Sequence, residues 1–458
     1  MSSFLRKLVF IACIGLILCF SILYTESFLV VSLYTLGVFY TMWGIYHIII
    51  AAAGRRPPRV GGGDKDPVAT SLLPAISQQL PKISVIIPAR NEPILSRTIE
   101  ACLNHTDYPL EKKEVVVVVD DPDGERIAFW YQQRYPGNVK LLARRKLYPT
   151  KPSALNDSIH LCTGDIIAIM DVEDIPDRDV FLKAAAALAN KEIYAAQAIL
   201  RISNPQDSWI TRIFSMEYAG WFRLLLNGRS RLGLYTPLGG TGNYFKRAAL
   251  KHVGLYDSTN LAEDAELSVR LLMAGWNVCV LDSRHWEEAP TTFKGWLRQR
   301  SRWYRGWLQS LWKYIAIMPS PKNLRRVGLL GTFSTLMMLV APFIMLLSWL
   351  AYGLTLVWLL EFAGLLPPLL SGLTQGPYWM AIPSSFNLLY FYFLAKGAKL
   401  EGIQLQFLPD LPRILCYTNF MMPVAALRAL YQEIFKPVVW EKTSHSGRGI
   451  KWHQTLNQ

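Results

Sequence analysis

The segment RQRSRWYRGW, at residues 298–307, interleaves cations with aromatic side chains. It contains Arg298, Arg300, Arg302 and Arg305 around Trp303, Tyr304 and Trp307. Three kinds of site fit this mixture: a nucleic-acid stripe, a helix on a membrane surface, and a pocket that holds a small polyanion beside a stacking ring. Arginine suits a diphosphate because its planar guanidinium donates two hydrogen bonds at once. If residues 293–318 are helical, Gln299 and Trp303 lie one turn apart, with Arg302 beside them.

Two groups of carboxylates follow apolar runs that have the composition of strands. The groups are Asp120 and Asp121 in VVVVDDPDG, and Asp171, Glu173 and Asp174 in IAIMDVEDIPD. Such carboxylates lie at the carboxyl edge of a parallel sheet, where open α/β sheets bind ligands. Adjacent carboxylates repel each other, so the second group indicates either a cation or a solvated loop. The apolar strand before it favours Mg²⁺ or Mn²⁺, which takes one or two carboxylates together with diphosphate oxygens.

A third acidic pair, Glu263 and Asp264, stands in TNLAEDAELSVRL at residues 259–271. Thr259 or Asn260 can cap a helix here, and the helix dipole stabilises acidic residues in the first turn. Helix capping therefore accounts for the acidic pair at this position. A catalytic base at the start of the helix would account for it equally. Considered alone, this segment leaves both interpretations open.

The composition indicates a membrane protein with a soluble part. The 458-residue chain is 51% hydrophobic and 18% charged, whereas about a quarter of the residues in soluble proteins are charged. Its net charge of +14 suits anionic partners such as nucleic acid, phosphorylated substrates or an acidic leaflet. The sequence has no further basic clusters and no reader motif, so we expect no nucleic-acid partner. The six cysteines lack a Cys-x-x-Cys pairing, which favours reduced thiols and a cytoplasmic soluble part.

Apolar stretches flank the soluble part on both sides. We predict two transmembrane helices within 1–53, a linker at 54–81, an α/β domain at 82–292, amphipathic interface helices at 293–326, about four transmembrane helices within 327–435 and a tail at 436–458. Runs such as ISVIIPA and EVVVVVD indicate buried parallel strands, which makes the soluble part an α/β fold. By the positive-inside rule we predict six membrane crossings, with four as the fallback, and cytoplasmic ends.

The order of these elements resembles the family 2 glycosyltransferases of the membrane-embedded synthase type, which include cellulose synthase and hyaluronan synthase. In that family a GT-A domain carries an Asp-Asp pair, an Asp-x-Asp motif, a Thr-Glu-Asp motif and Gln-x-x-Arg-Trp. The matching residues are Asp120–Asp121, Asp171-Val172-Glu173 with Asp174, Ala262-Glu263-Asp264, and Gln299 to Trp303. Two positions depart from the pattern: Glu173 stands where Asp is usual, and Ala262 replaces the common Thr. The variant DVED is similar to a bacterial cellulose-synthase-like subgroup.

The resemblance implies a role for each motif. Asp264 is then the catalytic base, with Glu263 beside it, while Asp171, Glu173 and Asp174 hold Mg²⁺ or Mn²⁺. The implied nucleotide-sugar site comprises Pro88, Glu92, Asp120, Asp121, Lys151, Asp171, Gln299, Arg300 and Arg302. The implied acceptor side comprises Trp303, Gly240, Thr241, Gly242 and Asn243.

The resemblance also implies a GT-A, Rossmann-like domain in the cytoplasm, inserted between the N-terminal and C-terminal helices of an integral, multi-pass cell-membrane protein. We predict an inverting, processive hexosyltransferase that polymerises a β-linked polysaccharide from UDP-glucose or a related UDP-hexose and passes it across the membrane. The alternative is a non-processive enzyme that glycosylates a diacylglycerol or ceramide. A third interpretation is an inactive, transferase-like transporter or regulator. Expected partners are the UDP-sugar, a growing glycan or lipid acceptor, membrane lipid and a second copy in a homo-oligomer.

Overall fold

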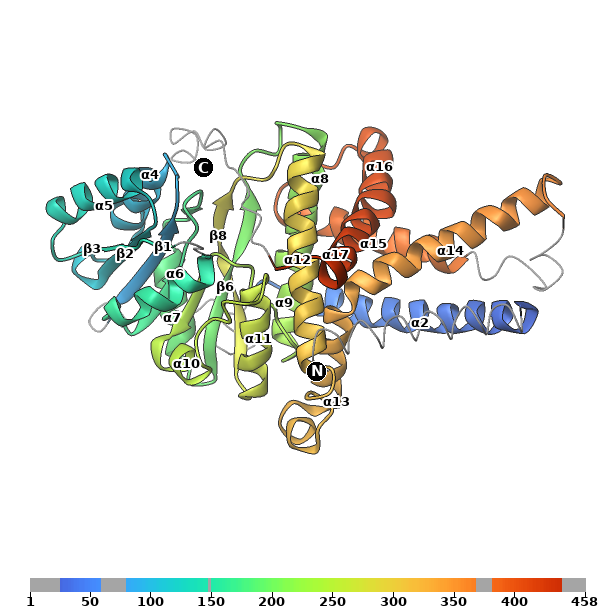
Figure 1. The fold of residues 1–458 in the computed structure, drawn as a ribbon, viewed down its shortest axis with the longest axis horizontal. Helices are drawn as coiled ribbons and strands as arrows, with labels where there is room; N and C mark the ends of the chain where they lie inside the picture. The colour runs from blue at the N-terminus through green and yellow to red at the C-terminus, as the bar shows by residue number, and fades with distance from the viewer. Residues whose placement is uncertain (1–24, 59–79, 147–149, 368–380, 439–458) are drawn as a thin grey trace.

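The computed structural model describes residues 25–58, 80–146, 150–367 and 381–438. Within these residues, eight strands form one sheet in the order β3-β2-β1-β4-β7-β6-β8-β5 (Figure 1). The strands are β1 (Ile83–Ala89), β2 (Lys113–Val119), β3 (Val139–Ala143), β4 (Ile166–Ile169), β5 (Ile175–Pro176), β6 (Ile193–Ile202), β7 (Asn243–Lys246) and β8 (Asn277–Glu287). Branched aliphatic side chains dominate β1 and β2, as suits strands that are buried on both faces.

The two halves of the sheet differ in strand direction. β1 pairs in parallel with β2 and β4, and β2 pairs in parallel with β3. The prediction of parallel strands from ISVIIPA and EVVVVVD is therefore confirmed. Beyond β4 the sheet is mixed, because β7 runs antiparallel to both β4 and β6, and β5 runs antiparallel to β8. The carboxyl ends of β1, β2 and β4 consequently meet at one edge.

Helices cover both faces of the sheet. One face packs on α4, α5 and α7, and the other packs on α6, α10 and α11. The helices and short turns are α4 (Leu95–Glu100), η2 (Ala101–His105), η3 (Leu110–Lys112), α5 (Pro122–Arg134), α6 (Lys151–Ser158), η4 (Ile159–Leu161), α7 (Val180–Ala189), α10 (Arg247–His252) and α11 (Glu263–Met273). The side chains of Asp121 and Thr150 cap α5 and α6, which fixes where these helices begin.

A layer of helices separates the sheet from the apolar helices (Figure 1). It consists of α8 (Trp209–Tyr218), the π-helix η5 (Ala219–Leu226), α9 (Asn227–Arg231) and the long α12 (Phe293–Tyr314). The Thr292 side chain caps α12 by accepting a hydrogen bond from the Gly295 N–H at 3.2 Å. α12 lies within the stretch 293–318 that the sequence predicts as amphipathic.

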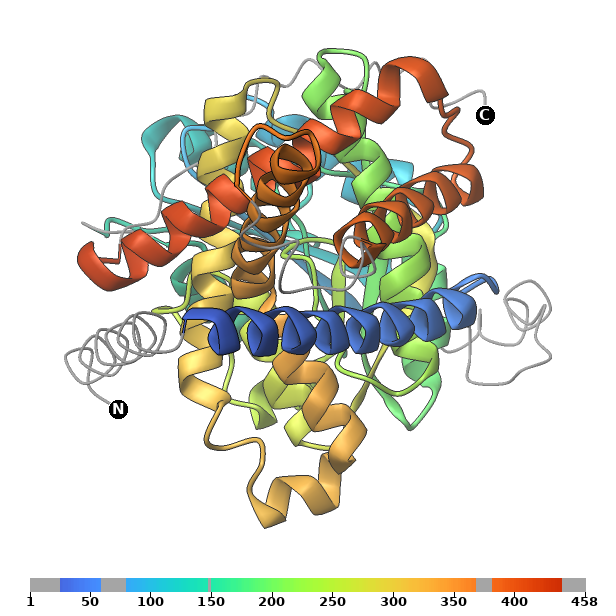
Figure 2. The ribbon, with the colours of Figure 1, turned by 90° about the vertical axis from the view of Figure 1, so that its right-hand side faces the viewer.

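The apolar helices project away from the sheet, and in the view of Figure 2 they face the reader. They are α2 (Thr25–Gly54), α13 (Pro321–Leu339), α14 (Ala341–Phe362), α15 (Ala381–Leu400), α16 (Phe407–Cys416), η7 (Tyr417–Met421) and α17 (Met422–Phe435). Among the described residues, Gly37–Gly54 and Phe407–Phe435 are long and apolar enough to cross a membrane, and α13 with the start of α14 gives a third span if this pair, bent by 57°, counts as one. Residues 1–24, where the first of the two helices predicted within 1–53 would lie, are outside the described residues, and six crossings remain a prediction.

Glycines allow the apolar helices to touch the second layer backbone to backbone. A Cβ atom on Gly54 would lie 1.8 Å from the Leu224 carbonyl oxygen, and one on Gly228 would lie 2.0 Å from the Ile50 carbonyl oxygen. α2 therefore packs directly on η5 and α9. A Cβ atom on Gly397 would lie 2.3 Å from the Cα atom of Gly220, so α15 approaches η5 equally closely.

Buried ion pairs reinforce these joints. Glu401, which follows α15, accepts hydrogen bonds from Arg201 of β6 at 2.6 Å and from Arg284 of β8 at 3.2 Å. Asp410 of α16 accepts two hydrogen bonds from Arg212 of α8, at 2.8 and 2.7 Å. Because a buried charge left without its partner is costly, these pairs hold the sheet and the apolar helices in one arrangement.

Candidate active site

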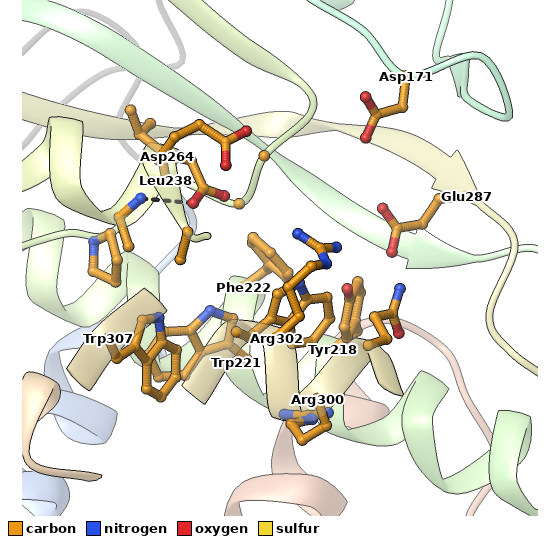
Figure 3. A pocket seen from close by; sticks show the side chains of 18 of the residues that line it. Asp171, Tyr218, Trp221, Phe222, Leu238, Asp264, Glu287, Arg300, Arg302 and Trp307 are labelled. Carbon is orange, nitrogen blue, oxygen red and sulfur yellow. Dashed lines mark hydrogen bonds between the residues drawn. The ribbon is translucent and has the colours of Figure 1, made fainter. Parts of the chain in front are cut away.

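A cavity of about 430 Å³ extends from the carboxyl edge of the sheet to the apolar helices. Figure 3 shows the carboxylates of Asp171, Asp264 and Glu287 on one side of it and the rings of Trp221 and Trp307 on the other. The cavity thus has a polar end and an apolar end.

Asp120 and Arg144 form a buried ion pair at the sheet edge. The Arg144 Nη2 atom lies 2.5 Å from Asp120 Oδ2, and Arg144 also pairs with Asp157. Asp120 Oδ1 is buried and accepts no hydrogen bond from the described residues. Asp120 lines the cavity together with Pro88 and Glu92, so three predicted nucleotide contacts share this end.

Asp121 lies behind the cavity wall, although the sequence prediction pairs it with Asp120. Its Oδ1 accepts a hydrogen bond from the Gly124 N–H at 2.8 Å, and its Oδ2 accepts one from the Asn91 N–H at 2.7 Å. Asn91 adopts a φ of 52°, a conformation that costs energy for a residue with a side chain. Asp121 therefore caps α5 and stabilises the turn that carries Glu92.

The second acidic group divides between the wall and the interior. Asp171 and Glu173 line the cavity. Asp174 is fully buried and accepts a short hydrogen bond from the Thr241 hydroxyl. Burial, followed by repulsion from Asp171, raises the pKa of Asp174 to about 8. Asp174 supports the loop from below instead of facing the cavity with the predicted metal ligands.

Lys151, the first residue of α6, reaches the same place. Its Nζ pairs with Asp171 and donates a hydrogen bond to the Gly240 carbonyl oxygen at 3.0 Å. Burial lowers the pKa of Lys151, but Asp171 and Glu263 raise it, with a net pKa above the ordinary value. A charged ammonium group therefore lines the polar end of the cavity.

The residues on the wall fit a divalent cation that is shared with a ligand. Among the described residues, no three His, Cys, Asp or Glu side chains gather closely enough to hold a metal ion by themselves. Asp171 and Glu173 supply two carboxylates, and Mg²⁺ is commonly bound by one or two carboxylates plus substrate phosphates. A diphosphate would complete this partial set of oxygen ligands.

One carboxylate oxygen of Asp264 accepts a hydrogen bond, and the other is directed at the loop that carries Gly240. Its Oδ1 accepts a hydrogen bond from the Ala265 N–H at 2.7 Å, and a Cβ atom on Gly240 would lie 3.1 Å from its Oδ2. Burial raises the pKa of Asp264. Burial and repulsion from Asp264 raise the pKa of Glu263 to about 7. Carboxylates with raised pKa values beside a cavity suit proton transfer near neutral pH.

α12 forms the wall opposite these carboxylates. Gln299, Arg302 and Trp303 line the cavity, as predicted from their one-turn spacing. Arg302 Nη1 donates to the Leu261 carbonyl oxygen at 3.3 Å, and Figure 3 shows its guanidinium turned toward the carboxylate side. The cation thus lies where it can meet an anionic ligand.

Gly306 sets the distance between α12 and α11. A Cβ atom there would lie 2.3 Å from the Ala262 backbone nitrogen and 2.4 Å from the Ala262 Cβ atom. Ala262, which departs from the family's usual Thr, is therefore a packing contact between the helix of Asp264 and the helix of Arg302.

Arg300, which the sequence predicts to contact the nucleotide, also lines the cavity, but its guanidinium is turned toward Glu217. Its Nη1 and Nη2 donate to the two carboxylate oxygens of Glu217, at 2.8 and 2.5 Å. Figure 3 shows Arg300 lower in the view than Arg302, on the side away from Asp171. The ion pair with Glu217 is the physical reason for this direction.

The loop before β7 approaches the cavity mainly through glycine. Gly240 lines the wall with a φ of +79°, a conformation that favours glycine. The other predicted acceptor contacts lie behind it: Thr241 is bonded to Asp174, Gly242 packs on His285, and Asn243 is buried in β7.

The far end of the cavity is mainly apolar, with His47 beside Trp43 and Phe393 as a polar exception. Trp221, Phe222 and Leu225 of η5 contribute to the apolar lining. The deeper lining comes from five other helices: Trp43, Met337, Met338, Ala341, Met345, Tyr390, Phe393, Leu394 and Met422. Methionine side chains are flexible and adapt to irregular apolar partners.

A family model described as "Glycosyltransferase like family 2" matches residues 81–306, which carry the polar end of the cavity and most of α12. Residues 81–306 form a family 2 glycosyltransferase domain. Similar proteins include the probable glycosyltransferase YdaM of Bacillus subtilis, 30% identical over 52% of this chain and 58% of its own. A beta-monoglucosyldiacylglycerol synthase of Nostoc sp. is 26% identical over 59% and 57% of the two chains, and a poly-beta-1,6-N-acetyl-D-glucosamine synthase of Staphylococcus epidermidis is 25% identical over 51% and 57%. The chain thus spans a little more than half the length of these curated relatives.

The fold of the transferase domain and the adjoining helices also has a counterpart among solved structures. A mannosyltransferase from Pyrobaculum calidifontis, solved in complex with GDP-Man and Mn²⁺, superposes with a TM-score of 0.55 over 88% of this chain and 99% of its own, at 18% identity. At this identity the likeness establishes the GT-A fold.

Several residues that line the cavity have no recognised motif in the sequence. Glu287 ends β8 and lines the cavity. Burial, then repulsion from Asp174 and Glu173, raises its pKa well above the ordinary value, while a hydrogen bond with Tyr218 lowers it. The pattern of an apolar strand that ends in an acidic residue, as at Asp120, could have found it. Trp221 and its neighbours stand in an apolar stretch without a diagnostic spacing.

Proposed function

We propose that this chain transfers a single sugar from a nucleoside diphosphate sugar, with inversion at the anomeric carbon, to a hydroxyl group of a membrane lipid. The continuity of the cavity, from Asp120 and Asp171 to Met345 and Phe393, carries this proposal. A lipid would place its hydroxyl beside Asp264 and its chains among the apolar side chains, a division that suits an amphiphile.

The polar end would bind the donor. Asp120 Oδ1, which has acceptor capacity to spare, suits the base or ribose of the nucleotide. Lys151 and Arg302 would contact the diphosphate, since both present cations to the cavity. A Mg²⁺ or Mn²⁺ ion held by Asp171 and Glu173 would, when bound, offset the negative charge of the diphosphate.

Asp264 would act as the base. Its Oδ2 takes the proton of the acceptor hydroxyl as that oxygen attacks the anomeric carbon, and the bond from that carbon to the diphosphate breaks on the opposite face. The departing diphosphate gains negative charge, which Arg302 stabilises from α12. An α-linked donor would thereby give a β-linked product.

A processive polysaccharide synthase is the second candidate. Four indole rings line the cavity, from Trp43, Trp221, Trp303 and Trp307, and such flat faces suit the apolar faces of successive sugars. A polymer would have to leave past the methionine side chains of the far end, which donate no hydrogen bonds to sugar hydroxyls, although His47 lines that end as well. This mismatch makes it the second choice.

The proposal includes a membrane setting with the transferase domain in the cytoplasm, where nucleotide sugars are made. Exposed apolar side chains such as Val38, Ile45, Leu356 and Leu408 support contact with lipid. Protease added outside intact cells should leave residues 82–292 uncut. Cleavage within these residues would show that the transferase domain lies outside the cell.

Product analysis tests the proposed reaction. Purified protein would receive radiolabelled UDP-sugars, Mn²⁺ and diacylglycerol in mixed micelles, with Asp264→Asn as the inactive control. We expect label in the organic phase at one sugar per lipid. Label in an ethanol-insoluble polymer would favour the second candidate, and the absence of nucleotide release with every donor would refute transferase activity.

A further inference from the structure

Arg300 joins three segments that are distant in the sequence. Its guanidinium donates to both carboxylate oxygens of Glu217 in α8 and, at 3.0 Å, to the hydroxyl of Tyr417, where η7 begins. Tyr417 donates in turn to Glu217 at 2.5 Å, and Trp296 of α12 donates its indole N–H to Tyr417 at 2.8 Å. These four side chains form a closed network at the junction of α8, α12 and η7.

Aromatic rings surround the same guanidinium. The Arg300 Cζ atom lies 4.9 Å from the ring centroid of Trp303 and 5.3 Å from the centroids of Trp296 and Phe214. A cation at these distances attracts the faces of aromatic rings, more strongly where water is excluded. Trp303 also packs on Phe214, with centroids 6.2 Å apart. The cavity-lining indole is thus held by Arg300 and by Phe214.

Two π-helical segments begin next to this network. η5 starts two residues after Glu217 and carries Trp221 and Phe222 to the cavity, and η7 starts at Tyr417 itself. π-helical turns are rare and are frequent at functional sites. The network therefore fixes two segments whose geometry is unusual.

We infer that Arg300 is a positioning residue that holds Trp303 as the wall for the acceptor and does not bind the diphosphate. This inference rests on the proposed transfer, because it assigns Trp303 to the acceptor. The guanidinium fork is required: a lysine ammonium keeps the charge but cannot bond both oxygens of Glu217 and Tyr417 in one plane.

Three matched substitutions on α12 separate the roles. Arg300→Lys tests the network, Arg302→Lys tests the diphosphate contact, and Arg298→Lys is the control because Arg298 is exposed on the same helix. We would measure UDP-glucose affinity with Mn²⁺ by calorimetry, the KM for diacylglycerol in mixed micelles, and UDP-glucose hydrolysis without lipid. Arg300→Lys should raise the lipid KM about tenfold or more, the size of one lost charge-assisted hydrogen bond, while donor affinity and hydrolysis stay within about twofold.

Fluorine NMR tests the position of Trp303 without any acceptor. In protein labelled with 5-fluorotryptophan, the Trp303 signal is identified by its absence in Trp303→Phe. We expect Arg300→Lys to move this signal and Arg298→Lys to leave it in place. Glu217→Gln, which removes the charge from the other side of the network, should move it as well and serves if Arg300→Lys does not fold.

The outcomes separate this inference from the proposed function. If the wild-type protein glycosylates no lipid, the proposed function fails, but the Trp303 signal and the donor affinities still decide the role of Arg300. A Trp303 signal that stays unchanged in Arg300→Lys, or a loss of donor affinity equal to that of Arg302→Lys, would overturn the inference.

Discussion

Replacing Asp264 with Asn separates its function as a base from its contact with the helix start. The amide oxygen can still accept the hydrogen bond that Ala265 donates to Oδ1 at 2.7 Å, so α11 should lose at most about 1 kcal/mol. An amide cannot take the acceptor's proton, and removal of a general base costs about 10²–10⁴-fold in rate. Asp264→Asn should therefore fold and bind UDP while its turnover falls by that factor.

The pH dependence of the wild-type enzyme follows from the same residue. Burial raises the pKa of Asp264, so the carboxylate takes up its proton at a higher pH than an exposed aspartate does. Activity should fall as the pH drops through that raised pKa, and Asp264→Asn should lose this acidic limb. We would record UDP release, product formation and UDP affinity on one preparation across the pH range.

Glu263→Gln is the matched comparison, because Glu263 precedes Asp264 and lines the same cavity. If Asp264→Asn keeps more than about a tenth of the wild-type rate, its loss falls short of the range for a general base. If Glu263→Gln loses more activity than Asp264→Asn, the base has been assigned to the wrong carboxylate. Either result refutes the reasoning.

Three further predictions concern packing, metal and the joints between layers. Gly306→Ala should lower turnover at least about tenfold, since its Cβ atom would lie 2.3 Å from the backbone nitrogen of Ala262, the residue before α11, and push Arg302 away, whereas Gly353→Ala, with nothing within 4 Å, should not affect UDP release. Asp171→Asn should raise the Mn²⁺ concentration needed for half-maximal activity, and full activity of the wild-type protein in excess chelator would contradict a metal role. Glu401→Gln should destabilise the protein by about 3–5 kcal/mol in a thermal unfolding assay, because it removes the buried carboxylate that pairs with Arg201, Arg223 and Arg284. As a control measured by thermal unfolding, Asp123→Asn breaks the exposed pair with Arg126 and should cost less than about 1 kcal/mol.

The sequence predicts the polar half of the site well because its signals are local. Valine and isoleucine runs identify β1 and β2, and the carboxylates that follow β2 and β4 must lie at the shared edge of parallel strands. The directions in which side chains of α12 point are also determined by local sequence spacing. Arg300 and Arg302 are two residues apart, and residues at that spacing on a helix point in different directions. Helical periodicity could thus have separated their roles.

Other features depend on contacts that no local pattern contains. The antiparallel insertion of β7 between β4 and β6 follows from long-range pairing. Asp120 and Asp121 are adjacent at the end of a strand, and their roles are separated by contacts: Asp121 accepts from the Asn91 and Gly124 N–H groups, whereas Asp120 pairs with Arg144. The apolar end of the cavity is lined by side chains of helices that are hundreds of residues apart, such as Trp43 and Met422. No spacing of residues along the sequence could therefore reveal it.

The buried ion pairs between layers give the chain a unit of folding that is larger than its family domain. The family match ends at residue 306, yet Arg201, Arg212 and Arg305 have their carboxylate partners beyond residue 400. A fragment cut at the family boundary would carry these arginines without counter-charges, at a cost of several kcal/mol for each that stays buried. The same ion pairs constrain the exchange of domains between related proteins. A transferase domain of this kind can be joined to another set of apolar helices only if the arginines and their carboxylates are inherited together.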